Sequence, residues 1–333
     1  MSLNDFSLKN VFTARQRIAK ITRRTPLVTS STLSAVTGAK ILLKLENLQP
    51  TGAFKLRGAT NKILSLSDEE RARGVITVSS GNHGRAVAYV ASLQNIQATI
   101  CLPKTVPENK RAAIRGLGAD IRVVGDDYDA AMNYADQLQA ESKMTMVHAF
   151  DDLDIIAGQG TIGLELLDDA PELDTVIVPL SGGGLMSGIA FAVKNISPNI
   201  HVVGVTMERG PAMVESIKAG RVVEIVEEPT LADALAGGIN KDNKYTLPLV
   251  QKYVDETVLV SEEEIADGIF HCLKEEHLVV EGGAAVGVSA LLSKKIQNLG
   301  KNIAVVISGG NIPLDVLKKI IVENTTATNP LLR

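Results

Sequence analysis

The stretch DTVIVPLSGGGLMSG (residues 174–188) decides the fold class, because it joins a nearly continuous apolar run to a glycine-rich turn and a helix-compatible segment. Such short runs are typical of strands that are buried on both faces. Similar runs occur at residues 74–80, 98–103, 120–125, 144–149, 201–206 and 302–308. Helix-compatible segments lie between them, among them residues 109–117, 127–142, 182–196 and 262–274. This alternation predicts an α/β fold with two open, twisted, mostly parallel sheets and flanking helices.

The strand runs fall into two groups, one ending near residue 148 and the other beginning near residue 174. A length of 333 residues also favours roughly two domains. We predict a large domain formed by residues 1–50 and 149–333, and a small domain formed by residues 51–148. By pattern alone, the N-terminal segment fits either group. It contains an amphipathic helical pattern at residues 8–20 and a hairpin-like stretch at residues 25–46.

The composition argues against several classes of protein. A net charge of −4, with 34 basic and 38 acidic residues interspersed, disfavours nucleic acid and membrane surfaces as partners. Aromatic residues make up 3% of the chain and tryptophan is absent, so stacking platforms for single strands are not expected. No apolar segment approaches the ~18 residues of a membrane span. The N-terminus lacks an apolar signal region, so we expect a cytoplasmic protein. Cys101 and Cys272 are expected to be buried, reduced thiols.

Three glycine-rich turns follow predicted strands, where open α/β folds bind ligands. The turn SSGNHGRA (79–86) offers backbone N–H groups and side-chain donors from Ser80, Asn82 and His83 to a carboxylate or phosphate, although a plain helix cap explains it equally well. In PLSGGGLMSG (179–188) three successive glycines suit one phosphate, since neither a dinucleotide fingerprint nor a Walker lysine is present. The weakest of the three, SGGN, begins at Ser308, whose hydroxyl is a candidate partner for a ring nitrogen or a backbone group.

The stretch PTGAFKLRGA (50–59) sets a lysine in an unusual frame. Lys55 follows Phe54 among small and apolar residues, where an amine can be desolvated and its pKa lowered toward nucleophilic use. A single lysine is ordinarily a solvated surface charge. A candidate amine, a phosphate turn, a carboxylate turn and a terminal Ser-Gly-Gly-Asn turn are together what an enzyme needs to hold pyridoxal phosphate (PLP) with an amino-acid substrate.

These segments resemble the PLP-dependent enzymes of the tryptophan-synthase-β fold type (PLP fold type II), in the serine/threonine dehydratase and serine racemase branch. The resemblance follows family order and covers nearly the whole chain. It is carried by ENLQPTGAFKLRGA (46–59), SSGNHGRAVA (79–88), LPKTVPENKRAAIRGLGA (102–119), IIAGQGTIGLEL (155–166), SGGGL (181–185), TLADALAGG (230–238) and ISGGN (307–311). It implies that PLP lies in the cleft between the two domains, and that the small domain carries the substrate-carboxylate turn.

The resemblance assigns a role to each matching residue. Lys55 would bond covalently to PLP and then act as the base at the substrate Cα, with Ser80 as a candidate acid/base on the opposite face. The remaining cofactor contacts would come from Phe54, Asn82, Ser181, Gly182, Gly183, Gly184, Leu185, Gly238, Glu281 and Ser308. The substrate carboxylate would be bound by Ser79, Ser80, Gly81, Asn82 and His83. Asn82 is expected at the PLP phenolate oxygen, the backbone of 181–185 at the phosphate, and Ser308 at the pyridine nitrogen.

Several positions depart from the family pattern. Ala53 stands where relatives usually have serine, Ala149 replaces the usual proline, and Ser181 begins a phosphate turn that often has a fourth glycine. Phe150 and the two aspartates after it follow the dehydratase pattern, since racemases tend to have asparagine near this position. Ser80 occupies the position of the racemase acid/base, where many bacterial threonine dehydratases have alanine. Racemisation is therefore chemically possible.

No divalent metal is expected at the site that some members of the family possess. Thr206 and Ala212 occupy the aligned carboxylate positions. Glu208 is a neighbouring carboxylate, but one such group cannot supply the six or more oxygen ligands that Ca²⁺ usually takes.

The segment MERG (207–210), with SSGNHGRA and EGGAA (281–285), is similar to the hydroxyectoine-utilisation dehydratase subgroup. The first hypothesis is therefore β-elimination from a 3-hydroxy amino acid of hydroxyectoine breakdown, giving a keto acid or an enamine/imine product plus ammonia. Alternatives are a threonine/serine ammonia-lyase, a serine/threonine racemase with side dehydratase activity and, from another class, a non-catalytic PLP-binding regulator. Only 22 residues follow Asn311, so no appended amino-acid-sensing domain is expected. The resemblance also implies a homodimer.

Overall fold

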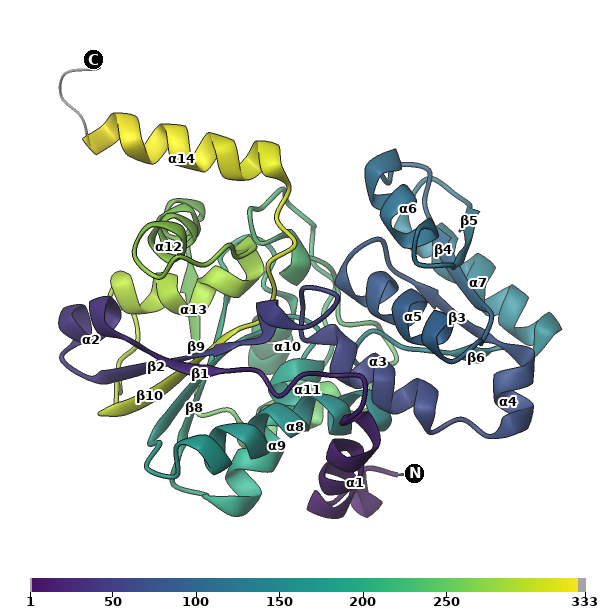
Figure 1. Ribbon diagram of the computed structural model, residues 1–333, viewed down its shortest axis with the longest axis horizontal. Coiled ribbons are helices and arrows are strands. Elements are labelled where there is room, and N and C mark those ends of the chain that lie inside the picture. Colours follow the sequence, from purple (N-terminus) through teal and green to yellow (C-terminus); the bar gives the residue numbers. More distant parts are fainter. Residues whose placement is uncertain (1, 329–333) are drawn as a thin grey trace.

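The computed structural model describes residues 2–328, and the strands within them form two separate sheets (Figure 1). The large sheet has the order β1 (Leu27–Ser30), β2 (Lys40–Leu45), β10 (Asn302–Ile307), β7 (Thr175–Pro179), β8 (His201–Met207), β9 (Glu256–Val260). The small sheet has the order β5 (Asp120–Val123), β4 (Ala98–Leu102), β3 (Val75–Val78), β6 (Thr145–Met146). Within the described residues every strand pair is parallel except β1–β2. The expected α/β fold with two open, mostly parallel sheets is confirmed.

Helices cover both faces of the large sheet (Figure 1). One face packs on α8 (Leu153–Asp169), α9 (Gly184–Ile196), α10 (Ala212–Ala219) and α11 (Thr246–Tyr253). The other face packs on α2 (Ser31–Thr37), α12 (Glu262–Lys274), α13 (Gly282–Leu292) and α14 (Leu314–Thr328). Neighbouring residues of one strand pack on opposite faces of the sheet. Val176 of β7 packs on the face covered by α8–α11, and Ile177 packs on the face covered by α2 and α12–α14. Burial on both faces explains why these strands read as continuous apolar runs.

The small sheet is covered by α3 (Lys55–Leu64), α5 (Asn82–Leu93) and α6 (Glu108–Arg115) on one face and by α7 (Tyr128–Ser142) on the other. Helix α3 also packs on α8, and so joins the two sheets. The two helices approach closely because a Cβ at Gly158 would lie 2.7 Å from the Arg57 carbonyl oxygen and from the Gly58 Cα. The remaining elements are α1 (Leu8–Ile18), α4 (Asp68–Arg73) and the 3₁₀ turns Leu3–Asp5, Glu46–Leu48 and Asp233–Leu235.

All seven strand runs predicted from the sequence are strands, and the five named helical patterns are helices with slightly shifted ends. The hairpin-like stretch contains the antiparallel pair β1–β2, but α2 separates the two strands. Strand β9 was not predicted, because it is a partly exposed edge strand that begins with Glu256 and Thr257. Cys101 and Cys272 are buried and free, as expected. No helix in the described range is long and apolar enough to cross a membrane.

Candidate functional site

Lys55 is the first residue of α3 and is fixed in place by the loop that follows β10. The N–H of Phe54 donates to the Ser308 carbonyl (3.0 Å), and Ala53 forms an isolated antiparallel bridge with Gly309. These backbone contacts join the opening stretch to a segment more than 250 positions later. The amine of the half-buried Lys55 therefore starts from a rigid backbone.

The Lys55 amine lies in an apolar environment with one hydrogen-bond acceptor. Its Nζ donates to the Ala149 carbonyl at 2.7 Å and lies 5.4 Å from the Phe54 ring centroid. Burial lowers the pKa of Lys55 to about 8, and the nearby Glu281 carboxylate opposes part of this shift. A substantial fraction of the amine is therefore neutral near physiological pH, as a nucleophile requires.

The glycine turn lies between β7 and α9, directly against Phe150. A Cβ at Gly182 would overlap the Phe150 ring, and a Cβ at Gly184 would lie 2.9 Å from the Phe150 Cα. Gly183 has a φ of +88°, which L side chains rarely adopt. Packing alone thus requires these glycines. The turn also begins α9, and the first N–H groups of a helix have no partner within it, so they are suited to an anion. The Ser181 hydroxyl donates to the Leu235 carbonyl at 2.9 Å.

The turn at residues 79–83 connects β3 to α5. It is tight, since a Cβ at Gly84 would overlap the Ser79 carbonyl oxygen, whereas Gly81 faces open space. The half-buried Ser80 has no hydrogen-bond partner in the part of the chain that the structure describes. These features suit a carboxylate-binding turn.

His83 differs from its sequence-based prediction as a side-chain donor to the ligand. Its ring is 3% exposed, and Nε2 lies 2.9 Å from the Val147 carbonyl in the small-sheet core. Burial and the nearby Lys55 lower the pKa of His83 to about 3, so the ring is neutral. The backbone of His83 remains in the turn, but its side chain has a structural partner. A histidine between Asn82 and Gly84 gives no sign in the sequence of which way its ring points.

Asn82 belongs to a polar network that crosses from α5 to the large sheet. Its Nδ2 donates to Glu281 Oε1 at 2.6 Å, and its Oδ1 accepts from Asn311 Nδ2 at 2.7 Å. Asn311 Oδ1 accepts in turn from Arg85 Nη1 at 2.7 Å. Burial, and next Asp233, raise the pKa of the Glu281 carboxyl to about 7, although the Asn82 hydrogen bond lowers it. Arg85 was not predicted as a site residue, because a helical arginine looks like a surface charge in the sequence.

Ser308 and Gly238 differ in their surroundings. Ser308 is 3% exposed, and its hydroxyl has no hydrogen-bond partner within residues 2–328. Gly238 is exposed, and a Cβ added there would meet no heavy atom within 4 Å. Ser308 therefore offers a hydroxyl to a ligand, whereas Gly238 offers only backbone groups and open space.

The predicted residues come together through direct contacts. Lys55 contacts Ala149, and the adjacent Phe150 packs on the glycine turn. Asn82 contacts Glu281, whose carboxylate lies beside Gly309, the neighbour of Ser308. Segments from four strand ends (β3, β6, β7 and β10) thus meet between the two sheets, at the carboxyl ends of parallel strands.

The structure also shows the residues at the position where some family members bind a divalent metal. Thr206 and Ala212 are buried, and Glu208 forms an ion pair with Lys295 at 3.2 Å. Across residues 2–328, no group of three or more His, Cys, Asp or Glu side chains is arranged to hold a metal ion.

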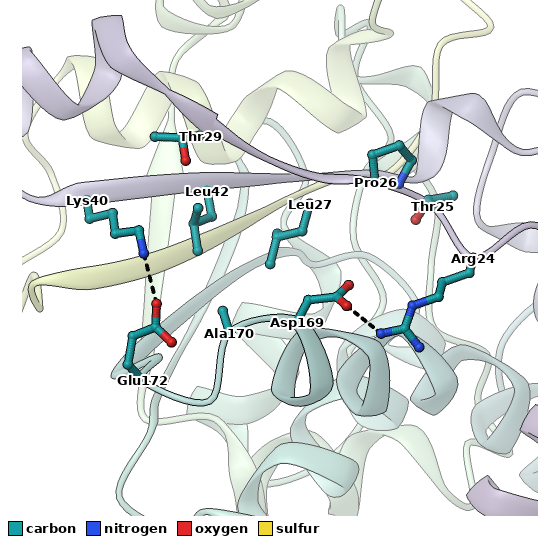
Figure 2. Close-up of a pocket in the computed structure, with 10 residues that line it drawn as sticks. All are labelled: Arg24, Thr25, Pro26, Leu27, Thr29, Lys40, Leu42, Asp169, Ala170 and Glu172. Carbon is teal, nitrogen blue, oxygen red and sulfur yellow. Dashed lines mark hydrogen bonds and ion pairs between the residues drawn. The ribbon is translucent and has the colours of Figure 1, made fainter.

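A cavity of about 510 Å³ lies elsewhere, between β1–β2 and the C-terminal end of α8 (Figure 2). Its charged lining is already paired, since Lys40 Nζ contacts Glu172 at 2.8 Å and Arg24 contacts Asp169 (Figure 2). None of the residues assigned above to cofactor or substrate lines this cavity. The chemistry is therefore assigned to the Lys55 region, which holds the amine with the lowered pKa and the Ser80 and Ser308 hydroxyls.

Two further groups were not predicted from the sequence. A buried cluster of charges surrounds Arg57, with carboxylates from Glu46 and Glu165 and the ammonium of Lys44. His148 and Asn240 form a second group beside Phe150, with their side chains 2.9 Å apart. The segment HAFDDLD carries a histidine and three aspartates, but the sequence does not indicate which of them contact the site.

The residues fit PLP on observations of this structure. Ser308 is 3% exposed and its hydroxyl forms no hydrogen bond in the described residues, so it can pair with a ring nitrogen. The glycine turn presents the start of α9 to an anion, and the Lys55 amine has a lowered pKa. These are a ring contact, a phosphate contact and a covalent anchor, respectively.

Comparisons with known proteins agree with this fit. A family model of pyridoxal-phosphate dependent enzymes matches residues 18–309. The chain is 48% identical to a provisionally named threonine dehydratase of Sinorhizobium fredii (96% of each chain) and 46% identical to an L-threonine ammonia-lyase of Thermotoga maritima (95% of this chain, 78% of the relative). A structure of maize serine racemase superposes with a TM-score of 0.89 at 34% identity (96% of this chain, 98% of the other). The chain therefore belongs to the family of pyridoxal-phosphate-dependent enzymes.

Proposed function

We propose that this enzyme removes the elements of water and then ammonia from a 3-hydroxy amino acid and releases a keto acid. The observation that carries the proposal is the Lys55 amine, which has a lowered pKa and contacts the segment that packs on the glycine turn. Relatives named threonine dehydratase and L-threonine ammonia-lyase, at 48% and 46% identity, support it. A purely regulatory role would not need this amine.

The proposed roles follow from the position of each group. When bound, PLP supplies an electron sink for the bonds at the substrate Cα. Lys55 anchors the cofactor and takes the Cα proton. The turn at 79–83 binds the substrate carboxylate, and the backbone of 181–185 binds the cofactor phosphate. Water lost in the elimination is returned in the hydrolysis, so the net products are one keto acid and one ammonia.

Ser308 favours elimination over slower chemistry. A serine hydroxyl, unlike an aspartate, cannot keep a pyridine nitrogen protonated, so the ring withdraws electrons less strongly. Prompt loss of the β-hydroxyl is therefore favoured over a long-lived charge at Cα. Replacing Ser308 with aspartate should lower keto acid release relative to proton exchange at Cα, which NMR in deuterated water measures.

The reaction class is tested with purified enzyme and added PLP. Serine and threonine should each be turned over to a keto acid with equimolar ammonia, and Lys55→Ala should release neither. A wild-type enzyme that binds PLP but releases no keto acid from any 3-hydroxy amino acid would contradict the proposal.

For the substrate, we propose a hydroxy amino acid from hydroxyectoine breakdown, on the resemblance of MERG (207–210) and EGGAA (281–285) to that subgroup. Glu281 belongs to the site network, whereas Met207 is buried and Glu208 pairs with Lys295. A screen of serine, threonine, 3-hydroxyaspartate and the hydroxyectoine-derived compound ranks them by kcat/KM. The proposal requires the hydroxyectoine-derived compound to have the highest kcat/KM. A higher kcat/KM for threonine would instead identify the enzyme as a threonine ammonia-lyase.

Racemisation is a second candidate activity, favoured by the Ser80 hydroxyl without a partner in the described residues. The maize serine racemase, with a TM-score of 0.89, supports it. Ser80→Ala should abolish inversion of a chiral substrate while keto acid release continues. If wild-type enzyme produces no inverted substrate, the chain lacks this activity.

We also propose the assembly of the enzyme. Residues 1–50 and 149–333 would form a large domain and residues 51–148 a small one, so that the site lies between them. A homodimer is proposed from the family resemblance, and light scattering on the purified enzyme should give twice the 35.4 kDa chain mass. A monomer mass would contradict it.

A further inference from the structure

The segment beside Lys55 is fixed by an imidazole ring. His148 Nδ1 accepts hydrogen bonds from the backbone N–H of Phe150 (3.2 Å) and of Asp151 (2.8 Å). A ring nitrogen that accepts hydrogen bonds from two N–H groups uses its lone pair as the acceptor and therefore carries no proton. The neutral ring therefore holds its proton on Nε2.

The side-chain amide of Asn240 satisfies this tautomer, which the two backbone donors at Nδ1 set. The amide lies 2.9 Å from Nε2, and its nitrogen and oxygen can exchange places. Two donors cannot form a hydrogen bond, so the amide oxygen must face the ring, an exchange that leaves the shape unchanged. With that orientation Nε2–H donates to Asn240 Oδ1, and both ring nitrogens are satisfied.

The surroundings keep the ring neutral. Burial is the first cause of the lowered pKa of His148, and the Lys55 charge also lowers it. The carboxylates of Asp151 and Asp152 oppose this effect, and the neighbouring His83 ring is itself neutral. The ring also meets the Phe150 ring edge-on, with centroids 4.8 Å apart at 89°. A neutral acceptor at Nδ1 is thus maintained.

The residues that His148 holds are those that touch the site. The Ala149 carbonyl accepts from the Lys55 amine at 2.7 Å, and Phe150 packs against Gly182 and Gly184 of the glycine turn. A small shift of this segment would move both the amine's acceptor and the wall of the turn. Asp151 has its own anchor, because its carboxylate accepts the N–H groups of residues 244–246 at 2.7–2.9 Å. Loss of the His148 ring should therefore disturb the site locally and leave the fold intact.

We propose that His148 is a positioning residue, whose Nε2–H tautomer, set by the two backbone donors at Nδ1 and satisfied by Asn240, holds Ala149 against Lys55 and Phe150 beneath the glycine turn. The proposal rests on the proposed role of Lys55 as the cofactor anchor. It gives His148 no contact with substrate.

Isosteric variants of the full-length enzyme with PLP separate this role from simple packing. The oxygen of His148→Asn occupies the place of Nδ1 and can accept the same two N–H groups, whereas His148→Gln replaces only Nε2 and His148→Ala replaces neither. We expect His148→Ala to lower kcat by about 10- to 100-fold with a KM change below about 3-fold, since small misplacements cost this much. His148→Asn should recover to within about 5-fold of wild type, and His148→Gln should not. His201→Asn, at the start of β8, is the matched control.

Two readouts are independent of turnover. Nitrogen-15 NMR of labelled imidazoles should show a ring with a protonated Nε2 and an unprotonated Nδ1 that is lost in His148→Asn and unaltered in His201→Asn. The His83 ring, whose Nε2–H faces the Val147 carbonyl, should give a second such signal in every variant. The pH midpoint of the visible absorption of bound PLP should shift in His148→Ala and return in His148→Asn. A protonated Nδ1, or equal defects in His148→Asn and His148→Ala, would overturn the proposal. If these spectra behave as expected but no hydroxy amino acid is turned over, the proposed function fails and the positioning role stands.

Discussion

Two cations on one helix, Lys55 and Arg57, have opposite electrostatic surroundings. Lys55 donates to one carbonyl oxygen, and burial lowers its pKa to about 8. Arg57 is 1% exposed and contacts two carboxylates, Glu46 at 2.7 Å and Glu165 at 2.6 Å, which raise its pKa despite burial. The same helix end therefore carries one reactive amine and one permanent charge. The distribution of counter-ions, and not burial by itself, separates the two.

The Arg57 region is balanced in charge and closed. Glu165 also pairs with Lys44 at 2.6 Å, so two cations face two carboxylates, all of them buried. Thr25 and Gln49 donate further hydrogen bonds to Glu46. Since every charge has a partner, this region serves the fold. The Lys55 region is the opposite, because its amine forms no ion pair and the Ser80 and Ser308 hydroxyls form no hydrogen bond within the described residues.

The strongest test of the comparison removes the reactive amine. Lys55→Ala should lower kcat by at least about 10³-fold, because both the anchor and the base are lost. The visible absorption of bound PLP should disappear with it. Lys40→Ala, an exposed lysine paired with Glu172, is the control and should keep both. Retained absorption and turnover in Lys55→Ala would show that another amine is the anchor.

Removal of the permanent charge should affect stability. Arg57→Met leaves the buried Glu46 carboxylate without its ion-pair partner and Glu165 with Lys44 alone, and breaking a buried pair in this way typically costs about 3–5 kcal/mol. The free energy of unfolding in urea measures it. Arg24→Met is the matched control, because Arg24 is half exposed, and should cost below about 1 kcal/mol. Equal small losses in both variants would contradict the structural role of the Arg57 cluster.

Removal of the amine should have the opposite effect on stability when PLP is absent. The folded-state pKa of Lys55 is lowered from 10.5 to about 8, so its favourable contribution is present above pH 10.5 and is lost as the pH falls through 8. At pH 7 the buried ammonium destabilises the chain. Lys55→Met should therefore raise the Tm of the cofactor-free protein at pH 7 by about 2–4 °C. A lower Tm would mean that Lys55 is stabilised by a partner in the fold.

The smallest expected effect on stability concerns Glu281, the carboxylate whose charge acts on the pKa of Lys55. The folded-state pKa of Glu281 is raised from 4.5 to about 7, so its contribution to stability is present below pH 4.5 and is lost as the pH rises through 7. Glu281→Gln should match wild type in urea unfolding at pH 4.5 and be more stable than wild type at pH 8. Glu208→Gln, half exposed, should show no such difference. Equal effects at both pH values would contradict the raised pKa.

The sequence predicted the parts of this molecule that have a local signature. Buried parallel strands read as apolar runs, and glycine turns after them marked the phosphate and carboxylate segments. It did not predict β9, whose edge position admits polar residues, nor the separation of β1 from β2 by α2. The partners of Arg57, Glu46 and Glu165, are 11 and 108 positions away, and their pairing depends on the crossing of α3 and α8. The ring orientations of His83 and His148 likewise depend on three-dimensional packing.

The central claim is that the Lys55 amine is desolvated and forms no ion pair within the described residues, whereas Arg57 on the same helix pairs with two carboxylates. Competitive labelling of the cofactor-free chain with a trace amine reagent across pH 6–12, read by mass spectrometry, measures the pKa of each lysine. The claim requires a midpoint near 8 for Lys55, with the exposed Lys40 labelled in the same samples as the internal reference. A Lys55 midpoint near 10.5 would contradict it.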